Sequence, residues 1–242
     1  VGSEMCIRDR KSTNFSLGFT TDIGENTTLT LDGYFVDVED RIYRTGDIQT
    51  DEGNSISFYT NTLDVEHQGI DLVLTSAWDW GSSSATTFTF AYNHNEIEVT
   101  DQKLVNGVNP VSDSLVEDIE NNYPEDRFVF TANTTFADSW WFMFRANWWG
   151  EHYDERGTIR GEPGDRSKEV GDVLYVDLEL GWDITEHWNV TVGGSNVFDE
   201  YPDKIKDDGV YANRVSVGLP YPRRTVTNYE GGSWYLRTSY NF

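Results

Sequence analysis

The sequence has one cysteine, Cys6, and no run of the roughly 18 consecutive apolar residues that a membrane-spanning helix requires. A single cysteine excludes a disulfide framework and a zinc site built on cysteines. The densest apolar run, Trp140 to Phe144, ends at Arg145. The sequence therefore predicts no helical membrane span.

Basic residues are scarce as well, because 18 Lys and Arg stand against 42 Asp and Glu, which gives a formal net charge of -24. Proteins that bind nucleic acids present clustered Lys and Arg to the phosphates, so we expect no nucleic-acid partner. The histidines lie on separate segments without metal-ligand spacing, and we expect no metal site and no cofactor. They are His67, His94, His152 and His187.

Motifs that carry catalytic chemistry are absent from the sequence. It contains no Gly-x-Ser-x-Gly elbow and no P-loop, and Gly193 and Gly194 lack the rest of a dinucleotide-binding fingerprint. We therefore expect that the protein is not an enzyme. Serine and histidine side chains from different strands could still meet in the folded protein, so this expectation rests on missing motifs only.

Apolar residues are few but regularly spaced. The hydrophobic fraction is 37% and the mean hydropathy is -0.57, which is low for a chain that buries a core. From Asn14 onward, apolar residues fall on every second position, which is the period of a β-strand; in the segment 178–182, Leu, Leu and Trp alternate with Glu and Gly. A transmembrane barrel strand faces lipid on one side and a polar lumen on the other, so low hydropathy and strict alternation occur together there.

The connections between the alternating segments differ in length in a regular order. Short turns are predicted at about residues 22–26, 79–85, 137–139 and 184–187. Long polar loops are predicted at about residues 43–62, 100–124, 150–171 and 200–231. An outer-membrane barrel has short periplasmic turns and long extracellular loops, so nine strands with a periplasmic C-terminus would produce this order.

Tryptophan positions support the same interpretation, because all nine tryptophans are predicted to lie near strand ends. Outer-membrane barrels carry belts of aromatic residues, called girdles, at the two membrane interfaces. Six tryptophans border short turns: Trp78, Trp80, Trp140, Trp141, Trp182 and Trp188. Three border long loops: Trp148, Trp149 and Trp234. Tryptophans that cap the core of a soluble sheet are the alternative explanation, and the collective placement favours the membrane.

The last ten residues, Ser233 to Phe242, alternate between two faces and end the chain on an aromatic residue. This pattern resembles the β-signal of outer-membrane proteins, in which the barrel-assembly machinery reads the terminal Phe and an aromatic residue two positions earlier. The resemblance implies that machinery as a partner. The residues assigned to the signal are Trp234, Leu236, Tyr240 and Phe242.

Three further segments resemble TonB-dependent receptors: Leu31 to Ile42 (LDGYFVDVEDRI), Asn61 to Leu74 with its HQGIDL core, and Gly193 to Pro202 (GGSNVFDEYP). The third is the strongest, because receptors of this family carry an Asn-Leu-Phe-Asp-like sequence at the outer end of the penultimate strand. Asn and Asp suit the exit of a strand into a loop, and Phe suits an aromatic girdle. The matching residues here are Asn196, Val197, Phe198 and Asp199, with Val in place of Leu.

The resemblance covers roughly Lys11 to Phe242 and implies an all-β fold, an antiparallel up-and-down transmembrane β-barrel. The barrel is expected to be partial, with about the last nine strands of 22, because nine strands cannot close so wide a barrel. The TonB box, the plug and the early strands are missing, so the chain is expected to be a fragment. Residues 1–10 show no strand alternation and are predicted to be a non-native leader, which leaves residues 11–242 as the C-terminal part of the barrel.

The long loops carry mostly acidic side chains, interrupted by basic and aromatic ones. Divalent-cation binding by the acids is conceivable, but no EF-hand spacing is present and solvated loop charge is the better explanation. The basic and aromatic residues are candidates to grip an anionic chelate or to stack on a sugar, and ordinary local ion pairing is the alternative for each. These ligand candidates are Tyr153, Arg156, Arg160, Arg166, Tyr211, Arg214, Tyr221, Arg223 and Arg224.

The resemblance implies an outer-membrane, multi-pass receptor that imports a scarce nutrient, such as a ferric siderophore, a corrinoid, haem or a saccharide. Its expected partners are outer-membrane lipid and lipopolysaccharide, a small-molecule ligand, and the TonB complex, which would act through the missing N-terminal part. Two other functions stay open at this point. One is a passive porin-like barrel, and the other is a soluble all-β carbohydrate-binding module whose aromatic residues stack on sugars.

Overall fold

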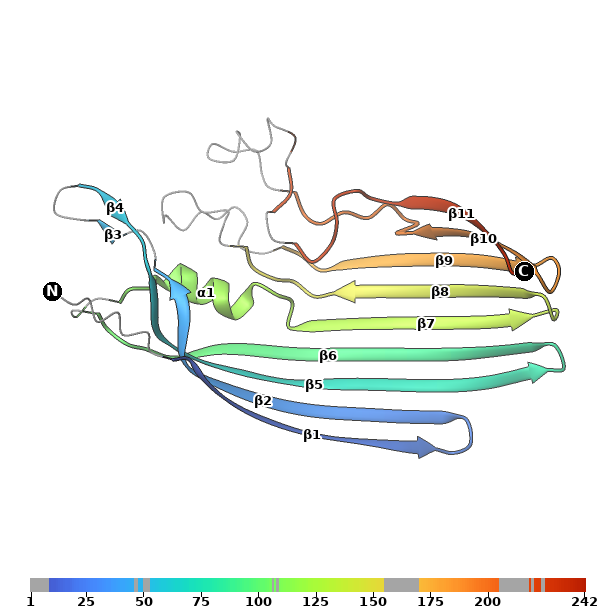
Figure 1. Ribbon diagram of the computed structural model, residues 1–242, viewed down its shortest axis with the longest axis horizontal. Coiled ribbons are helices and arrows are strands. Elements are labelled where there is room, and N and C mark those ends of the chain that lie inside the picture. The colour runs from blue at the N-terminus through green and yellow to red at the C-terminus, as the bar shows by residue number, and fades with distance from the viewer. Residues whose placement is uncertain are drawn as a thin grey trace.

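Nine strands that follow one another along the chain pair in the same order to form one antiparallel sheet (Figure 1). The structure is a computed structural model that describes residues 9–45, 48–49, 53–105, 107, 109–154, 170–204, 218, 220–222 and 225–242. The nine strands are β1 (Lys11–Ile23), β2 (Thr27–Arg44), β5 (Tyr59–Gly81), β6 (Ser84–Gln102), β7 (Asp126–Phe136), β8 (Trp140–Trp149), β9 (Val173–Asp183), β10 (Trp188–Ser195) and β11 (Ser233–Tyr240). Two short strands, β3 (Ile48–Gln49) and β4 (Ser55–Ile56), pair with each other, and one helix, α1 (Asp113–Asn121), precedes β7.

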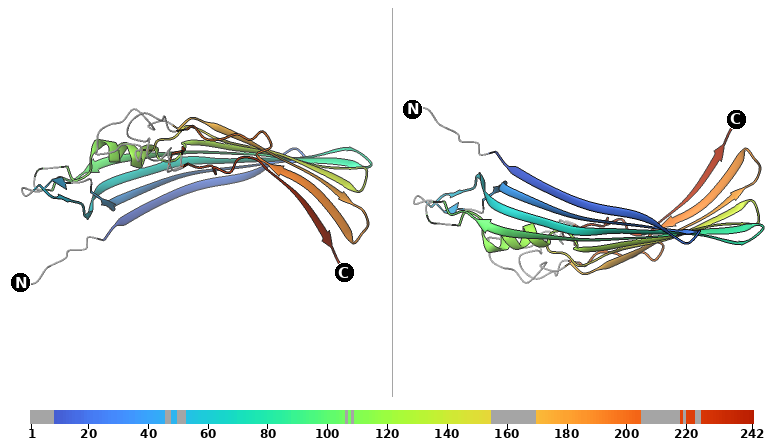
Figure 2. Two further views of the ribbon diagram at one scale, coloured as in Figure 1. Left: turned by 90° about the horizontal axis from the view of Figure 1, so that it is seen from above. Right: turned by 90° about the horizontal axis from the view of Figure 1, so that it is seen from below.

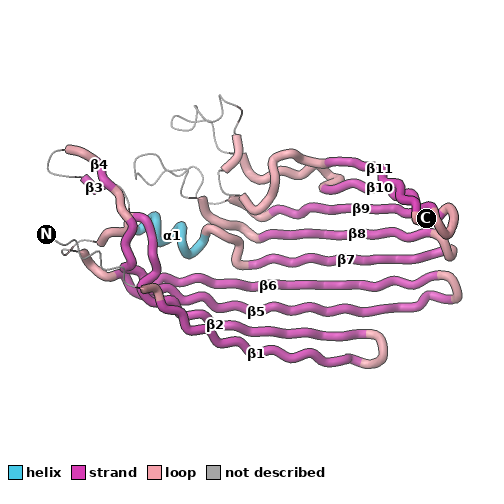
Figure 3. The backbone as a smooth tube through the Cα atoms, viewed as in Figure 1, coloured by secondary structure: helices cyan, strands magenta, loops and turns pink. Residues whose placement is uncertain are grey.

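The predicted order of short and long connections is confirmed. Residues 24–26, 82–83, 137–139 and 184–187 form short turns at one end of the sheet, and the strand ends that the longer connections join lie at the opposite end (Figure 3). Local chemistry explains why the turns are tight: Gly24 has a φ of 70°, and the turn between β7 and β8 has Ala137 and Asp138 at φ of 51° and 59°. The last strand ends at the short-turn end, where the backbone N–H of Asn241 donates to the carbonyl of His187 at 2.9 Å.

The two faces of the sheet differ in chemistry, as the alternation predicted. Leu178, Leu180 and Trp182 lie on what we call the apolar face, and their cross-strand neighbours Phe144, Phe142 and Trp140 lie on it with them. The opposite, polar face carries Asp177 and Glu179 from the same strand. Residues directly across a strand pair share a face, so the pairing extends this division over all nine strands.

Aromatic rings cover the apolar face over β6 to β9. Three rows of rings run across the strands, and neighbouring centroids within a row lie 5.2 to 6.4 Å apart. Such contacts add roughly 0.5–1.5 kcal/mol per pair to the burial of the rings. The rows are Phe90, Phe128 and Trp148; Phe88, Phe130 and Phe144; and Phe136, Trp140 and Trp182. All nine tryptophans lie at or near strand ends, which confirms the predicted placement.

Glycines on the polar face leave room for aromatic rings of the neighbouring strand. Tyr34 lies directly across from Gly69, and Trp141 lies directly across from Gly181. A β-carbon at either glycine would overlap with the facing ring. The same arrangement occurs between β10 and β11, where Tyr235 covers Gly193. Each ring thus occupies the space that a β-carbon on the next strand would fill, and glycine at such positions suits a twisted and curved sheet.

Strands β2 and β5 are 18 and 23 residues long, roughly twice the 9–11 residues that a tilted strand needs to cross a membrane. Their outer parts hold the buried apolar core, formed by Leu63, Val65, Val111 and Ile119. Helix α1 contributes Ile119 and packs on the polar face. The sequence analysis expected only a polar loop here, so α1 was not predicted. No helix among the described residues has the length and apolarity to cross a membrane.

Both edges of the sheet are open. Every residue of β1 and of β11 is exposed, and each of these strands has a neighbour on one side only. Seen from above and below, the sheet is a curved, twisted strip with β1 and β11 on opposite margins (Figure 2). An open strip of this shape agrees with the predicted partial barrel, because closure would need further strands between the two margins.

Candidate ligand-binding surface

Hydrogen bonds between polar side chains cross the polar face from strand to strand. The Tyr34 hydroxyl donates to Asn95 Oδ1 at 2.9 Å, across the intervening strand β5. Asn93 Nδ2 donates to Asp71 at 2.7 Å. Asn147 Nδ2 donates to Asp177 at 3.1 Å. These bonds satisfy groups that would be costly to leave unpaired in hydrocarbon, so this face suits a water-filled interior.

Asp177 connects the polar face to the loop that follows β10. Its Oδ1 accepts from the Ser195 hydroxyl and from the Asn196 backbone N–H, both at 2.9 Å. Its Oδ2 accepts from Asn147, so one carboxylate contacts both neighbouring strands. A carboxylate with several donors holds its surroundings rigid, and the loop exit at Asn196 is therefore fixed relative to β8 and β9.

The four-residue motif Asn196 to Asp199 forms the turn at this exit. Asn196 is buried and has a φ of 49°; its amide donates to the Glu200 carbonyl at 2.7 Å and accepts from the Glu200 N–H at 3.0 Å. Val197 donates from its backbone to the Val176 carbonyl at 2.8 Å. Asp199 Oδ1 accepts from the Gly232 N–H at 2.8 Å. The motif thus ties β9, β10 and the chain before β11 together, while Phe198 stays 68% exposed.

Three tyrosines stack beside this motif. Tyr221 lies between Tyr201 and Tyr229, with centroid distances of 5.9 and 5.3 Å and interplanar angles of 5° and 11°. Lys204 Nζ lies 6.0 Å from the centre of the Tyr221 ring. A hydrogen bond to Asp199 is the main cause that raises the pKa of Tyr201. Tyr221, a ligand candidate from the sequence, is therefore the middle member of a stack.

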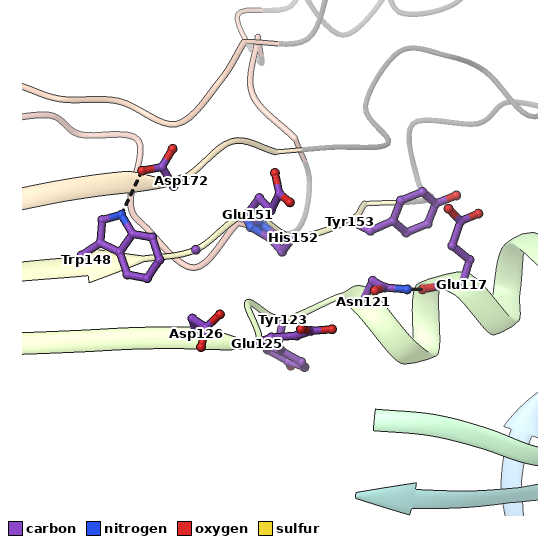
Figure 4. A pocket seen from close by; sticks show the side chains of 11 residues that line it. Glu117, Asn121, Tyr123, Glu125, Asp126, Trp148, Glu151, His152, Tyr153 and Asp172 are labelled. Atoms are coloured by element: carbon purple, nitrogen blue, oxygen red, sulfur yellow. Dashed lines mark hydrogen bonds between the residues drawn. The ribbon is translucent and has the colours of Figure 1, made fainter. Parts of the chain in front are cut away.

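A hollow of about 530 Å³ lies at the outer ends of β7 to β9, next to α1 (Figure 4). Trp148 Nε1 donates to Asp172 at one side of the hollow, with a distance of 2.9 Å. Asp126 accepts from the Tyr92 hydroxyl at 2.5 Å and lies 2.9 Å from His94 Nδ1. Five carboxylate side chains line the hollow: Glu117, Glu125, Asp126, Glu151 and Asp172. Among the described residues, no group of three or more His, Cys, Asp or Glu side chains is arranged to hold a metal ion.

The ligand candidates from the sequence are placed only in part. Tyr153 lines the hollow but is 5% exposed, so its ring contacts protein on most sides. Tyr221 is half-buried in the tyrosine stack. The remaining candidates fall outside the described residues and stay predictions: Arg156, Arg160, Arg166, Tyr211, Arg214, Arg223 and Arg224.

Sequence reasoning missed the acid-lined hollow and the helix beside it. One signal was available for the helix, because Leu115, Val116 and Ile119 follow the i, i+3, i+4 spacing of an amphipathic helix behind Ser112, a residue type favoured at helix starts. No signal was available for the hollow. It is built from α1, β7, β8 and the segment before β9, which are brought together only by the folded sheet.

Three of the four residues of the predicted assembly signal lie on β11, and Phe242 lies two residues beyond the end of this strand. Trp234, Leu236 and Tyr240 occupy one face of this edge strand and are all more than half exposed. Tyr240 and Phe242 contact each other edge to face, with centroids 5.3 Å apart. These aromatic side chains lie at the end of an edge strand, and within the described residues this strand pairs only with β10.

Comparisons with known proteins agree on one family. Residues 9–197 match the family model described as TonB dependent receptor-like, beta-barrel. The comparison with curated protein sequences gave no match.

One similar solved structure is the FrpB iron transporter from Neisseria meningitidis, with a TM-score of 0.63 and 12% sequence identity. The match covers 96% of this chain and 31% of the FrpB chain. Another is the ferric-catecholate import receptor Fiu from E. coli K12, with a TM-score of 0.59 and 13% identity, and the match covers 96% of this chain and 28% of the Fiu chain. A third is the ferripyoverdine receptor of Pseudomonas aeruginosa, with a TM-score of 0.58 and 13% identity, and the match covers 96% of this chain and 27% of the receptor chain. The chain thus spans about a third of the length of these proteins.

Proposed function

Because the chain belongs to the family of TonB-dependent receptor β-barrels, we propose that it is part of an outer-membrane receptor that imports a scarce nutrient. The nutrient is a ferric siderophore, a corrinoid, haem or a saccharide, and the energy for its import comes from the TonB complex. Residues 11–242 would form barrel wall, and residues 1–10 would be a non-native leader.

The observation that carries this proposal is the exposed apolar face of a single-layer sheet. Phe15, Leu17 and Leu236 are 66%, 73% and 74% exposed on strands over which the described residues form no second layer. A soluble carbohydrate-binding module would bury such a face against another sheet or a helix, because large apolar patches in water favour association. Lipid is the solvent that this face fits.

The same strand order supports a proposed orientation in the membrane. Short turns lie at one end together with the C-terminus, and barrels of this class place short turns in the periplasm. We therefore propose a periplasmic C-terminus, with the hollow, the tyrosine stack and α1 on the extracellular side. Lipopolysaccharide would surround that side.

The residues at the C-terminal edge are proposed to be the signal read by the barrel-assembly machinery, namely Trp234, Leu236, Tyr240 and Phe242. Their support is the exposure of β11, because an edge strand with aromatic side chains is available to another protein during assembly. The same strand would later pair with the first strand of the complete barrel.

Ligand capture is proposed for the extracellular surface, and no chemical step is part of it. The three solved structures named above are described as an iron transporter, an import receptor and a receptor, which supports binding and transport rather than catalysis. The loop candidates Tyr153, Arg156, Arg160, Arg166, Tyr211, Arg214, Tyr221, Arg223 and Arg224 remain the residues proposed to touch the ligand.

The proposal is tested with the full-length protein in its Gram-negative host. We expect the protein in the outer-membrane fraction, with different gel mobility before and after boiling, and we expect growth on the limiting nutrient to require both the receptor and TonB. Uptake that persists without TonB would indicate a passive porin instead. Solubility without detergent, together with identical mobility before and after boiling, would refute the membrane assignment.

A further inference from the structure

The acid-lined hollow beside α1 lies between two chain segments that are bonded to each other at both of its ends (Figure 4). At one end, the N–H of Gly150 donates to the carbonyl of Asp126 at 2.9 Å. At the other end, the N–H of Tyr153 donates to the carbonyl of Asn121 at 2.7 Å. Lining residues 123, 125, 151 and 152 lie between these two bonds. The hollow is therefore framed by hydrogen-bonded backbone.

A third segment closes the frame on the side of β9. His152 and Val170 exchange backbone hydrogen bonds of 3.0 and 2.8 Å. Two residues further along, Asp172 lines the hollow and accepts from Trp148 Nε1 at 2.9 Å. Three segments thus hold one another in place around the hollow, which makes it a preorganised feature of the fold.

The lining of the hollow has negative charge that no positive charge offsets. Five carboxylates line it, and no Lys or Arg among the described residues does. Glu117, Glu125 and Glu151 are exposed, and within the described part of the chain no hydrogen bond or ion pair reaches their carboxylates. A hollow lined by charges of one sign concentrates the electric field and attracts ions of the opposite sign.

Aromatic rings share the lining with the carboxylates. Tyr123, Trp148 and Tyr153 contribute them, and Tyr123 is 64% exposed. The face of a Tyr or Trp ring attracts a cation, and aromatic side chains are the means by which proteins recognise organic ammonium groups. Because no set of His, Cys, Asp and Glu side chains among the described residues is arranged to hold a metal ion, this lining suits an organic cation rather than a metal.

The size and the position of the hollow suit a small molecule. Its volume of about 530 Å³ lies within the range of roughly 300–1,000 Å³ that is typical of small-molecule sites. In the proposed orientation it lies on the extracellular side, where a ligand arrives first. The three exposed glutamates would meet that ligand at the mouth of the hollow.

We propose that this hollow binds a cationic nitrogen group, an ammonium, of a small soluble organic ligand. Glu117, Glu125 and Glu151 neutralise the positive charge, and Tyr123 contacts the group with its ring. The site rests on the proposed function and deepens it, because it gives the imported ligand a positive charge at this position. The loop candidates from the sequence were selected instead for an anionic chelate or a sugar.

The test measures binding of spermidine, an organic triamine, to the full-length protein purified in detergent, by isothermal titration calorimetry. Citrate and magnesium chloride are compared at the same ionic strength. Spermidine should bind, citrate should not, and magnesium should bind more weakly than spermidine. Magnesium that binds as tightly as spermidine would show an unspecific acidic surface and would overturn the proposal.

Variants of the lining separate the contribution of charge from that of the ring. Glu151→Gln and Glu117→Gln should each weaken spermidine binding by about fivefold or more, because one charge-assisted contact is lost. Tyr123→Leu should weaken it by about two- to fivefold and leave magnesium binding unchanged, since it removes a ring and no charge. Tyr123→Phe keeps the ring and should bind spermidine as wild type does.

Glu230→Gln is the matched control. Glu230 is exposed, lies in the segment before β11 and does not line the hollow. This variant changes the net charge as Glu151→Gln does, and it should bind spermidine as wild type does. Equal losses in the two variants would show an effect of net charge alone and would overturn the proposal. Gel mobility before boiling is compared for every variant, so that binding is scored only in folded barrel.

Unfolding without ligand shows whether a basic side chain of the protein itself fills the hollow. If the hollow receives a soluble ligand, Glu151→Gln should leave the Tm unchanged or raise it, because repulsion between carboxylates is reduced. A lower Tm for this variant, together with wild-type protein that does not bind spermidine, would overturn the proposal. TonB plays no part in these measurements. TonB-dependent uptake without spermidine binding would refute only this site, and spermidine binding without TonB-dependent uptake would refute only the proposed function.

Discussion

An arginine placed on the apolar face should lower the free energy of unfolding by an amount that depends on how deep its position lies in the membrane. On β9, Trp182 lies at the short-turn end, and Leu174 lies across from Trp148 at the other end. Eight residues separate them, which is about 26 Å along the strand and about 20 Å along the membrane normal at a tilt near 40°. Leu178 is the midpoint of this distance, whereas Leu180 lies only about 5 Å from the level of Trp182.

Leu178→Arg should therefore destabilise the folded protein by about 3 kcal/mol, and Leu180→Arg by about 1–2 kcal/mol. The polar-face control is Thr89→Arg, since the cross-strand neighbours of Thr89 are Thr75 and Thr131, and its cost should stay below about 1 kcal/mol. Glu179, adjacent to both leucines, is unsuitable as a control, because it accepts from Tyr235 and lies 3.7 Å from Arg237.

The assay is the free energy of unfolding in denaturant, measured for the full-length protein folded into lipid vesicles. A larger cost for Leu180→Arg than for Leu178→Arg would contradict the depth assigned to β9. An equal cost for Thr89→Arg and Leu178→Arg would contradict the assignment of the two faces.

Three more changes test other parts of the structure. Asn196→Ala should cost about 2–3 kcal/mol in the same unfolding assay, because two hydrogen bonds to Glu200 are lost and Ala replaces Asn at positive φ; an effect below about 0.5 kcal/mol would contradict the role of the motif. Gly181→Val should cost about 1–3 kcal/mol and shift the fluorescence of Trp141, whose ring occupies the space of the new side chain; unchanged fluorescence and stability would refute this contact. Deletion of Phe242 should lower the amount of heat-modifiable barrel in the outer membrane, and normal barrel at wild-type level would remove the assembly-signal assignment.

The sequence predicted the parts of the fold that depend on a period of two. Alternation at Phe88 and Phe90, or at Leu178 and Leu180, is a local property of a strand between two solvents, so strand order, faces and turns could be predicted. The lengths of β2 and β5 beyond the membrane could not, because their outer parts alternate less regularly around a register shift between Val38 and Arg41.

The surface that would meet the ligand was less accessible to sequence reasoning. Which donor finds which acceptor is decided by cross-strand neighbours, as for Asp177 with Asn147 and Ser195. The Asn196 motif was recognised by resemblance, and its physical role in tying three segments together became visible only in the fold.

The rings that lie over glycines on the polar face also constrain how this protein can change over evolutionary time. A larger residue at Gly181 requires that Trp141 first be lost or reoriented, and a smaller residue at position 141 leaves the backbone at Gly181 uncovered. The two positions are energetically coupled although they are 40 residues apart in the sequence. Among relatives of this chain, glycine and aromatic residue should therefore be exchanged together rather than one at a time. An alignment of such relatives would then reveal the strand register without any structure.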